Sequence, residues 1–197
     1  MSKIVFNYGV MNSAKTMELL ASQYRYESIG YQTILIKPAQ DDRSGSDIVA
    51  SRIGLTAKAD LVVSDDTPRG FEQKLISIIK EEPNKKKVIL IDESQFISPD
   101  IVESISWVSR TYDVNVFSYG LMKTFQNNLF DGSAAWVSEA TSLHEIKSTC
   151  EVCGHKATHN LRLLNGKPVY SGSVVMIGDQ EYKSVCAEHY HNFLVGA

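Results

Sequence analysis

Apolar and polar positions alternate in two different rhythms along the first two thirds of the chain. Short apolar runs of strand length are separated by longer stretches in which apolar residues recur every three or four positions, as on one face of a helix. The strand-like runs lie at about 3–8, 33–37, 87–91 and 114–119, and the helical stretches at about 15–29, at 70–80 and from 99 onward. This alternation predicts an α/β fold in which helices flank a parallel sheet, with right-handed crossovers. Ligands of such folds bind at the carboxyl ends of the strands.

The helix that follows residue 98 has a recognisable start. Ser98 suits the N-cap position and Pro99 the first helical turn. We expect the buried stripe of this helix to consist of Ile101, Val102, Ile105 and Val108.

The pattern changes after about residue 143. Short polar strands, glycine turns and clustered Cys and His residues replace the strand–helix alternation, and Asn165-Gly166 is typical of a hairpin turn. We therefore predict two domains, an α/β domain over residues 1–142 and a small metal-stapled domain over residues 143–197.

Composition and charge narrow the class of protein. The 197 residues are 43% hydrophobic and 22% charged, which is typical of a soluble globular protein. A net charge of -3 and a pI near 6.0 give no general attraction for nucleic acid or for an anionic membrane. The first residues lack the long apolar stretch of a signal peptide or a membrane span, so we expect a cytoplasmic protein.

The first motif with chemical content follows the first predicted strand and opens the first predicted helix. It reads G-x-x-x-x-A-K-T, one residue away from the phosphate-binding loop pattern G-x-x-x-x-G-K-[ST], and comprises Gly9, Val10, Met11, Asn12, Ser13, Ala14, Lys15 and Thr16. Backbone N–H groups and the helix start would face a phosphate, Lys15 would reach terminal phosphates, and Thr16 suits a magnesium ion. Ala14 is the departure, because it would be strained if its position needs a positive φ. On its own the motif is equally consistent with an ordinary strand–turn–helix.

The second motif, Asp92-Glu93-Ser94-Gln95-Phe96, ends the apolar run at 87–91. Neighbouring side chains on a strand point to opposite faces, so the two carboxylates can serve separate partners. Asp92 suits the binding of Mg²⁺ between nucleotide phosphates, and Glu93 suits a general base that accepts a proton from an acceptor hydroxyl. A lone Asp here could equally cap a helix, and Phe96 alone would favour core packing over stacking on a base.

The three cysteines all lie after residue 149, which favours metal binding over disulfides. Cys150-x-x-Cys153 and Cys186-x-x-His189 form two ligand pairs that can converge on one tetrahedral ion. Such a closed set suits structural Zn²⁺. His155 and His191 compete with His189 for the fourth place, and His189 has the spacing of the pair rule.

Taken together, these motifs resemble the type II thymidine kinase family, a group of small, zinc-containing, tetrameric kinases. The resemblance extends along nearly the whole chain. It rests on the phosphate loop, Asp41-Asp42-Arg43, Ser51-Arg52-Ile53-Gly54, the acidic motif, Tyr119-Gly120-Leu121 with Phe125, and Ile177-Gly178 with Tyr182 before Cys186.

The resemblance implies a P-loop, RecA-like fold with a zinc-stapled lobe, and transfer of the ATP γ-phosphate to the 5′-hydroxyl of thymidine. Glu93 would be the base. ATP and its phosphates would be bound by the phosphate loop with Arg43, Asp92 and Gln95, and magnesium by Thr16 and Asp92. Thymidine would lie beneath a lasso-like loop at 164–181, in a pocket formed by Met11, Phe96, Leu121, Phe125, Val174 and Tyr182. The family also implies a homotetramer and inhibition by thymidine triphosphate (dTTP).

The chain departs from the family pattern at several positions. Met122 and Thr124 stand where many relatives carry Arg and Asp, and the paired glycine before the lasso tyrosine reads Gly178-Asp179. Two alternatives to an active kinase therefore stay open. One is a nucleotide-binding regulatory protein that has lost turnover, and the other is a nucleic-acid-dependent P-loop ATPase, which the acidic pI disfavours.

Overall fold

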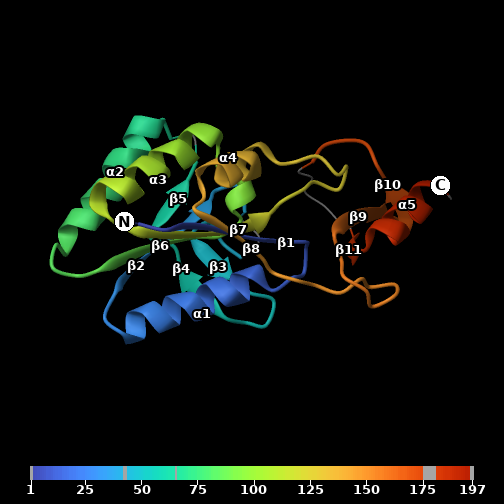
Figure 1. Cartoon of the computed structure of the whole chain (residues 1–197), viewed down its shortest axis with the longest axis horizontal. Coiled ribbons are helices and arrows are strands. Elements are labelled where there is room, and N and C mark those ends of the chain that lie inside the picture. Colours follow the sequence, from blue (N-terminus) through green and yellow to red (C-terminus); the bar gives the residue numbers. More distant parts are fainter. Residues whose placement is uncertain (1, 42–43, 65, 175–180, 196–197) are drawn as a thin grey trace.

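The computed structural model describes residues 2–41, 44–64, 66–174 and 181–195 (Figure 1). Its centre is a six-stranded sheet in which all neighbouring strands are parallel. The strand order is β5 (Leu61–Val63), β2 (Gln32–Pro38), β6 (Lys87–Ile91), β7 (Asn115–Leu121), β1 (Ile4–Gly9) and β8 (Ser142–Glu145). The predicted parallel α/β fold is therefore confirmed.

Helices cover both faces of this sheet. On one side lie α1 (Lys15–Ser28) and the hairpin of β3 (Ile48–Ala50) and β4 (Thr56–Lys58), as Figure 1 shows. On the other side α3 (Pro99–Tyr112) packs between α2 (Pro68–Glu81) and α4 (Asp131–Glu139). A short 3₁₀ helix, η1 (Ser94–Phe96), follows β6.

Alternating side chains of the central strands supply two separate cores. In β6, Ile89 and Ile91 belong to the cluster beneath α2, α3 and α4, whereas Val88 and Leu90 pack with Leu19 of α1. All five are fully buried. A strand covered on both faces has no polar side, which explains why β6 reads as one continuous apolar run in the sequence.

Most predicted elements are confirmed to within a few residues, and the differences have local causes. Helix α2 begins two residues earlier than expected, because the Thr67 hydroxyl accepts a hydrogen bond from the Gly70 amide and Pro68 takes the first helical position. Ser98 is the N-cap residue of α3, but its side chain makes no capping hydrogen bond. The stripe expected on α3 is buried throughout, at Ile101, Val102, Ile105 and Val108.

A small lobe follows the sheet and comprises residues 147–174 and 181–195. It contains a three-stranded antiparallel sheet and a terminal helix: β9 (His159–Leu164), β10 (Lys167–Val169), β11 (Glu181–Val185) and α5 (Ala187–Val195). The hairpin predicted at Asn165-Gly166 is present, and both residues have the positive φ of a tight two-residue turn, 52° and 73°.

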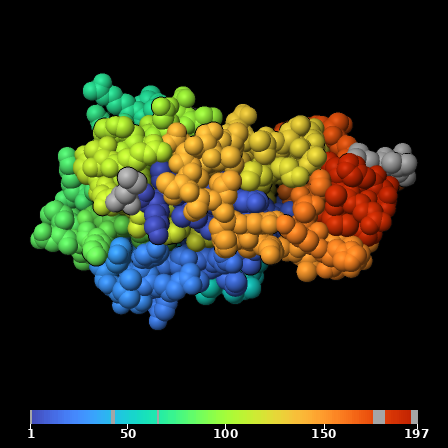
Figure 2. All heavy atoms as spheres, in the orientation of Figure 1, coloured from blue at the N-terminus to red at the C-terminus, as the bar shows by residue number. Residues whose placement is uncertain are grey.

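The small lobe forms one end of the molecule (Figures 1 and 2). Strand β8 still belongs to the large sheet, so the change of domain predicted at residue 143 falls inside this strand, and the division into two domains stays a prediction. Among the described residues, no helix is both long and apolar enough to cross a lipid bilayer.

Candidate functional site

The predicted phosphate loop and acidic motif meet at the carboxyl ends of β1 and β6. The loop connects β1 to α1, and Asp92 is the first residue after β6. The Thr16 hydroxyl lies 3.1 and 3.2 Å from the two carboxylate oxygens of Asp92 and donates a hydrogen bond to this group. The fold thus brings together the two residues predicted for magnesium, which are 76 positions apart in the sequence.

The phosphate loop is closely packed upon itself. A Cβ atom on Gly9 would lie 2.4 Å from the Ser13 hydroxyl oxygen and 2.7 Å from the Ile146 carbonyl oxygen, so only glycine fits there. The Lys15 ammonium group donates to the Val10 carbonyl oxygen at 2.7 Å and to the Ser13 hydroxyl at 3.3 Å. A lysine held across its own loop lies where an anion entering the loop would meet it.

Ala14, the departure from the phosphate-loop pattern, occupies a left-handed conformation with φ 63° and ψ 24°. The position therefore needs the positive φ that strains an alanine, and the loop nevertheless adopts this conformation. Asn12 is also left-handed, with φ 60°. No side chain caps α1, so backbone groups alone form the start of this helix, with the positive end of its dipole at the loop.

Asp92 is buried, with 4% of its surface exposed. Burial is the main cause that raises the pKa of its carboxyl group to about 7, and the negative charge of Glu93 acts in the same direction. Hydrogen bonds from Thr16 and from the Glu93 amide oppose the shift. Burial disfavours the charged form of this carboxyl group unless a cation is bound beside it. A carboxylate oxygen and a hydroxyl oxygen are ligands that a hard cation such as Mg²⁺ takes. The residues present therefore fit the predicted magnesium site.

Glu93 is fixed in an uncommon backbone conformation with φ 44°. Its carboxylate accepts a hydrogen bond of 2.6 Å from the Gln95 amide, whose oxygen in turn accepts from the Leu121 backbone N–H at 2.9 Å. Gln95, predicted to contact ATP, therefore bridges Glu93 and the end of β7. A carboxylate held in this way has a defined position from which to take a proton.

The residues predicted around thymidine lie in two groups. The first is at the strand ends: Met11 follows β1, Phe96 ends η1, and Leu121 ends β7. The Leu121 N–H donates to the side chain of Gln95, the residue before Phe96. Phe96 is partly buried, and its ring packs edge-on against the Phe130 ring, with 5.7 Å between the ring centroids.

The second group joins the loop after β7 to the small lobe. Phe125 is buried, and the Arg162 guanidinium lies over its ring at 4.7 Å. Arg162 pairs with Tyr182 across β9 and β11 and donates to the Ser173 carbonyl, next to Val174. Arg43 and the lasso positions at 175–180, Gly178 among them, lie outside the described residues.

The predicted metal ligands form a compact cluster. The ligand atoms of Cys150, Cys153, Cys186 and His189 all lie within 4.8 Å of one another. The His189 Nδ1 atom lies 3.1 Å from Cys186 Sγ and 3.8 Å from Cys150 Sγ, and Cys153 Sγ lies 3.9 Å from Cys186 Sγ. Ligands bound to one tetrahedral zinc are about 3.5 to 3.8 Å apart, so shifts of about 1 Å or less would bring these three sulfurs and one nitrogen to that spacing.

The surroundings of Cys150 favour the thiolate that a metal needs. Burial opposes ionisation, but hydrogen bonds from the backbone amides of Cys186, Val152 and Cys153 outweigh it and lower the pKa of the Cys150 thiol to about 6. His155 also lies close, with Nδ1 3.5 Å from Cys153 Sγ, but it is outside the four-membered cluster.

Several buried polar residues at the site carried no motif in the sequence. Lys37, at the end of β2, has 1% of its surface exposed and donates to the carbonyl oxygens of Gly45 and Ile48. Asn160 and Ser184 face each other on β9 and β11 and are also buried. The only sequence signal for these two is a polar residue at an inward position of a short strand, which is too common to identify a site.

Comparison with known proteins gives one consistent family. A family model described as thymidine kinase matches residues 2–190. Proteins named thymidine kinase from Streptococcus agalactiae and Streptococcus pyogenes are 40% identical over 193 residues, covering 98% of this chain and of each relative. One from Lactobacillus acidophilus is 40% identical over 199 residues and covers 96% of both chains. A solved structure, the genome-packaging NTPase B204 of Sulfolobus turreted icosahedral virus 2 in complex with ATP-gammaS, is 16% identical over 71% of each chain, with a TM-score of 0.43.

Proposed function

Since the chain belongs to the thymidine kinase family, we propose that it transfers the γ-phosphate of ATP to the 5′-hydroxyl of thymidine. The observation that supports this most strongly is the meeting of the phosphate loop with Asp92 and Glu93 at neighbouring strand ends. Phosphoryl transfer needs a phosphate cradle, a cation site and a base close together.

In this proposal each group has one task. The phosphate loop and Lys15 bind the phosphates of ATP. Thr16 and Asp92 would hold Mg²⁺, which neutralises phosphate charge when bound. Glu93, positioned by Gln95, accepts the proton of the 5′-hydroxyl as its oxygen attacks phosphorus. Ala14 takes the left-handed conformation that a glycine would take, so its methyl group does not prevent the loop from forming.

Met11, Phe96, Leu121, Phe125, Val174 and Tyr182 would enclose the thymine base. A flat base with one methyl group suits a pocket of aromatic and aliphatic side chains. The three cysteines and His189 would hold a structural Zn²⁺, because the set leaves no open coordination position. The homotetramer, inhibition by dTTP and a cytoplasmic location are further proposals that rest on the family.

The test is phosphoryl transfer from labelled ATP with Mg²⁺ to thymidine, deoxyuridine, deoxycytidine or no acceptor. Product with thymidine above the other acceptors supports the proposal. Folded protein that binds ATP but transfers to none of them contradicts it and favours a nucleotide-binding protein without turnover. The variant Glu93→Gln should lose about 100-fold or more of the transfer rate while ATP binding persists, since it removes the base and keeps the side-chain shape.

A further inference from the structure

Both backbone hydrogen-bonding groups of Met11 are bound by side chains of the small lobe. Its N–H donates to the side-chain oxygen of Asn160 at 2.8 Å, and its carbonyl oxygen accepts from the Ser184 hydroxyl in a short hydrogen bond. Asn160 and Ser184 are direct partners in the pairing of β9 with β11. One pair of cross-strand neighbours thus holds one residue of the phosphate loop through both of its backbone hydrogen-bonding groups.

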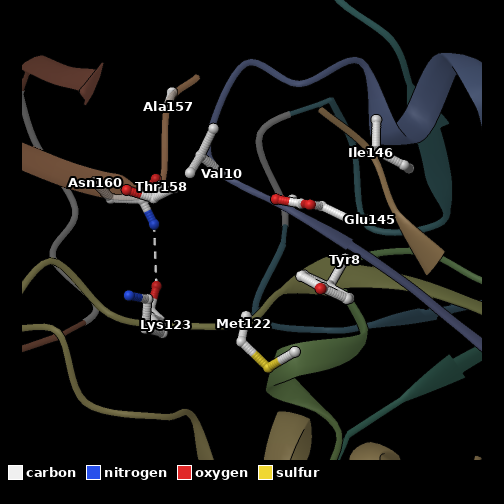
Figure 3. A pocket seen from close by; sticks show the side chains of 10 residues that line it. Tyr8, Val10, Met122, Lys123, Glu145, Ile146, Ala157, Thr158 and Asn160 are labelled. Atoms are coloured by element: carbon white, nitrogen blue, oxygen red, sulfur yellow. Dashed lines mark hydrogen bonds between the residues drawn. The ribbon is translucent and has the colours of Figure 1, made fainter. Parts of the chain in front are cut away.

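The orientation of Asn160 is fixed by a third hydrogen bond. Its side-chain nitrogen donates to the Lys123 carbonyl oxygen at 3.0 Å (Figure 3). Since an amide has one accepting and one donating end, Asn160 can bind the Met11 N–H and the Lys123 carbonyl simultaneously only in this orientation. The residue has 5% of its surface exposed, so water does not compete freely for these bonds.

Side-chain packing is incomplete at this place. A cavity of about 200 Å³ lies between the small lobe and the strand ends, as Figure 3 shows, with Thr158 and Asn160 on one side and Tyr8 and Met122 on the other. Side chains that border a cavity lack contacts on that side. Two of the three hydrogen bonds, from the Met11 N–H to Asn160 and from Ser184 to the Met11 carbonyl oxygen, therefore connect the small lobe to the phosphate loop at this place, and the third connects it to Lys123 after β7.

Ser184 is also tied to the cysteine pair that begins the small lobe. Its backbone N–H donates to the Glu151 carboxylate at 2.8 Å, and the Glu151 N–H donates to the Ser184 carbonyl oxygen at 2.9 Å. Glu151 lies between Cys150 and Cys153. Continuous hydrogen bonds thus lead from the candidate metal cluster through Glu151 and Ser184 to Met11.

We propose that Asn160 and Ser184 are positioning residues that hold the phosphate loop in its ATP-binding conformation, so that the affinity for ATP depends on the small lobe. This inference rests on the proposed function. Between Met11 and Lys15 the loop has two residues in the left-handed conformation, Asn12 and Ala14, and neither is a glycine. The loop conformation is therefore strained and needs contacts from the surrounding structure. Without the clamp on Met11, the loop would populate other conformations, and ATP would first have to select the competent one.

The effect should appear in affinity rather than in turnover. Once ATP is bound, its phosphates make their own hydrogen bonds to the loop and restore the competent conformation. Each lost hydrogen bond of ordinary strength corresponds to about fivefold in affinity. For Asn160→Ala and for Ser184→Ala we expect the Kd and the KM of ATP to rise about five- to tenfold, with kcat at saturating ATP within about threefold of the parent.

The double variant distinguishes a shared clamp from two independent contacts. Because both side chains bind the backbone of the same residue, Met11, the combined change should be smaller than the product of the single changes. Thr158→Ala is the matched control, since Thr158 lines the same cavity but its hydroxyl pairs with His159 rather than with the loop. It should leave the Kd of ATP within twofold of the parent.

The experiment measures ATP binding by calorimetry, steady-state kinetics with thymidine, zinc content and thermal unfolding for the parent and these four variants. Kd values of zinc-loaded, folded Asn160→Ala and Ser184→Ala within twofold of the parent would overturn the clamp, as would an equal loss in Thr158→Ala. A parent that binds ATP but phosphorylates no nucleoside would overturn the proposed function alone, and the clamp is then judged from the binding data. A parent that does not bind ATP overturns both.

Discussion

Individual residues at the candidate site are held in backbone conformations that ordinary side chains avoid. Asn12, Ala14 and Glu93 have positive φ values between 44° and 63°, and all three lie in the two motifs that the strand ends bring together. Such conformations cost about 1 kcal/mol or more each and persist only where the surroundings enforce them. The strain at Ala14 is the easiest to test, because glycine removes it without adding atoms.

Ala14→Gly should leave the free energy of unfolding unchanged or raise it by up to about 1 kcal/mol. The strain energy released at the left-handed alanine equals or exceeds the entropic cost that glycine adds by making the unfolded chain more flexible. Ala21→Gly is the matched control: Ala21 is exposed within α1, so the same substitution should lower the free energy of unfolding by about 1 kcal/mol. Urea unfolding of both variants checks the signs. An Ala14→Gly protein as destabilised as Ala21→Gly would show that the loop conformation is not strained.

Among the structural elements, the contact between β7 and η1 positions the candidate base. Gly120 permits this approach, since a Cβ atom there would lie 2.5 Å from the Ser94 hydroxyl oxygen and 2.8 Å from the side-chain oxygen of Gln95. Gly120→Ala should displace Gln95, leave Glu93 without its orienting hydrogen bond and lower kcat about tenfold or more. The KM for ATP should change less than kcat, because the phosphate loop lies on another strand end.

Kinetics with urea unfolding of the same Gly120→Ala protein test this. Gly70→Ala provides the control for the substitution itself, because the one atom within 4 Å of its new methyl group is the Thr67 hydroxyl oxygen at 3.0 Å and not an atom of Gln95. A kcat for Gly120→Ala equal to that of the parent would exclude the positioning role of Gln95.

The packing of α4 against α3 gives a pH-dependent prediction. The Glu139 carboxylate accepts hydrogen bonds from Ser106 at 2.6 Å and from Arg110 at 2.7 Å, and these interactions, with Ser106 the larger, lower the pKa of Glu139 below its ordinary value of 4.5. A carboxyl group with a lowered pKa in the folded state stabilises the fold at neutral pH, and this contribution is lost as the pH falls from about 4.5 through the folded-state pKa.

Glu139→Gln should therefore lower the free energy of unfolding by about 1 kcal/mol at pH 7, a value reduced for solvent screening, and by less at pH 4. Urea unfolding at both pH values measures the difference from the parent. Glu103→Gln, an exposed change on α3, is the control and should differ little from the parent at either pH. If Glu139→Gln lowers the free energy of unfolding by the same amount at pH 4 as at pH 7, the lowered pKa of Glu139 does not contribute to stability as proposed.

The elements also show what periodicity can and cannot predict. Strand β6 and helix α3 were located from the sequence because their apolar patterns are long and continuous. Strand β5 has three residues, and α4 begins at Asp131 without a side-chain cap, so neither gives a pattern that stands out. The same holds for the site: motifs marked Lys15 and Asp92, whereas Asn160 acquires its partners only through tertiary contacts with the loop.

At the scale of the whole molecule, the small lobe is too small to be stabilised by apolar burial alone. The buried residues of its described core are Cys150, Leu161, Leu163, Val185 and Tyr190, one of which is itself a candidate metal ligand. Small units of this size need a metal or a similar cross-link. The large sheet has two extensive cores of its own and should not share this dependence.

Cys153→Ser tests this dependence cleanly, because Cys153 is exposed and its replacement removes a candidate ligand without opening a cavity in the core. We expect the variant to bind little zinc and its amides in β9 and β11 to exchange hydrogen about tenfold faster or more, while those of β6 stay protected. Val152→Ser, an exposed change in the same turn, should retain zinc and protection. Hydrogen-exchange mass spectrometry with metal analysis separates the outcomes. A Cys153→Ser protein with full zinc and parental exchange would exclude this ligand, whereas fast exchange in β6 as well would mean that the metal stabilises the whole chain rather than one lobe.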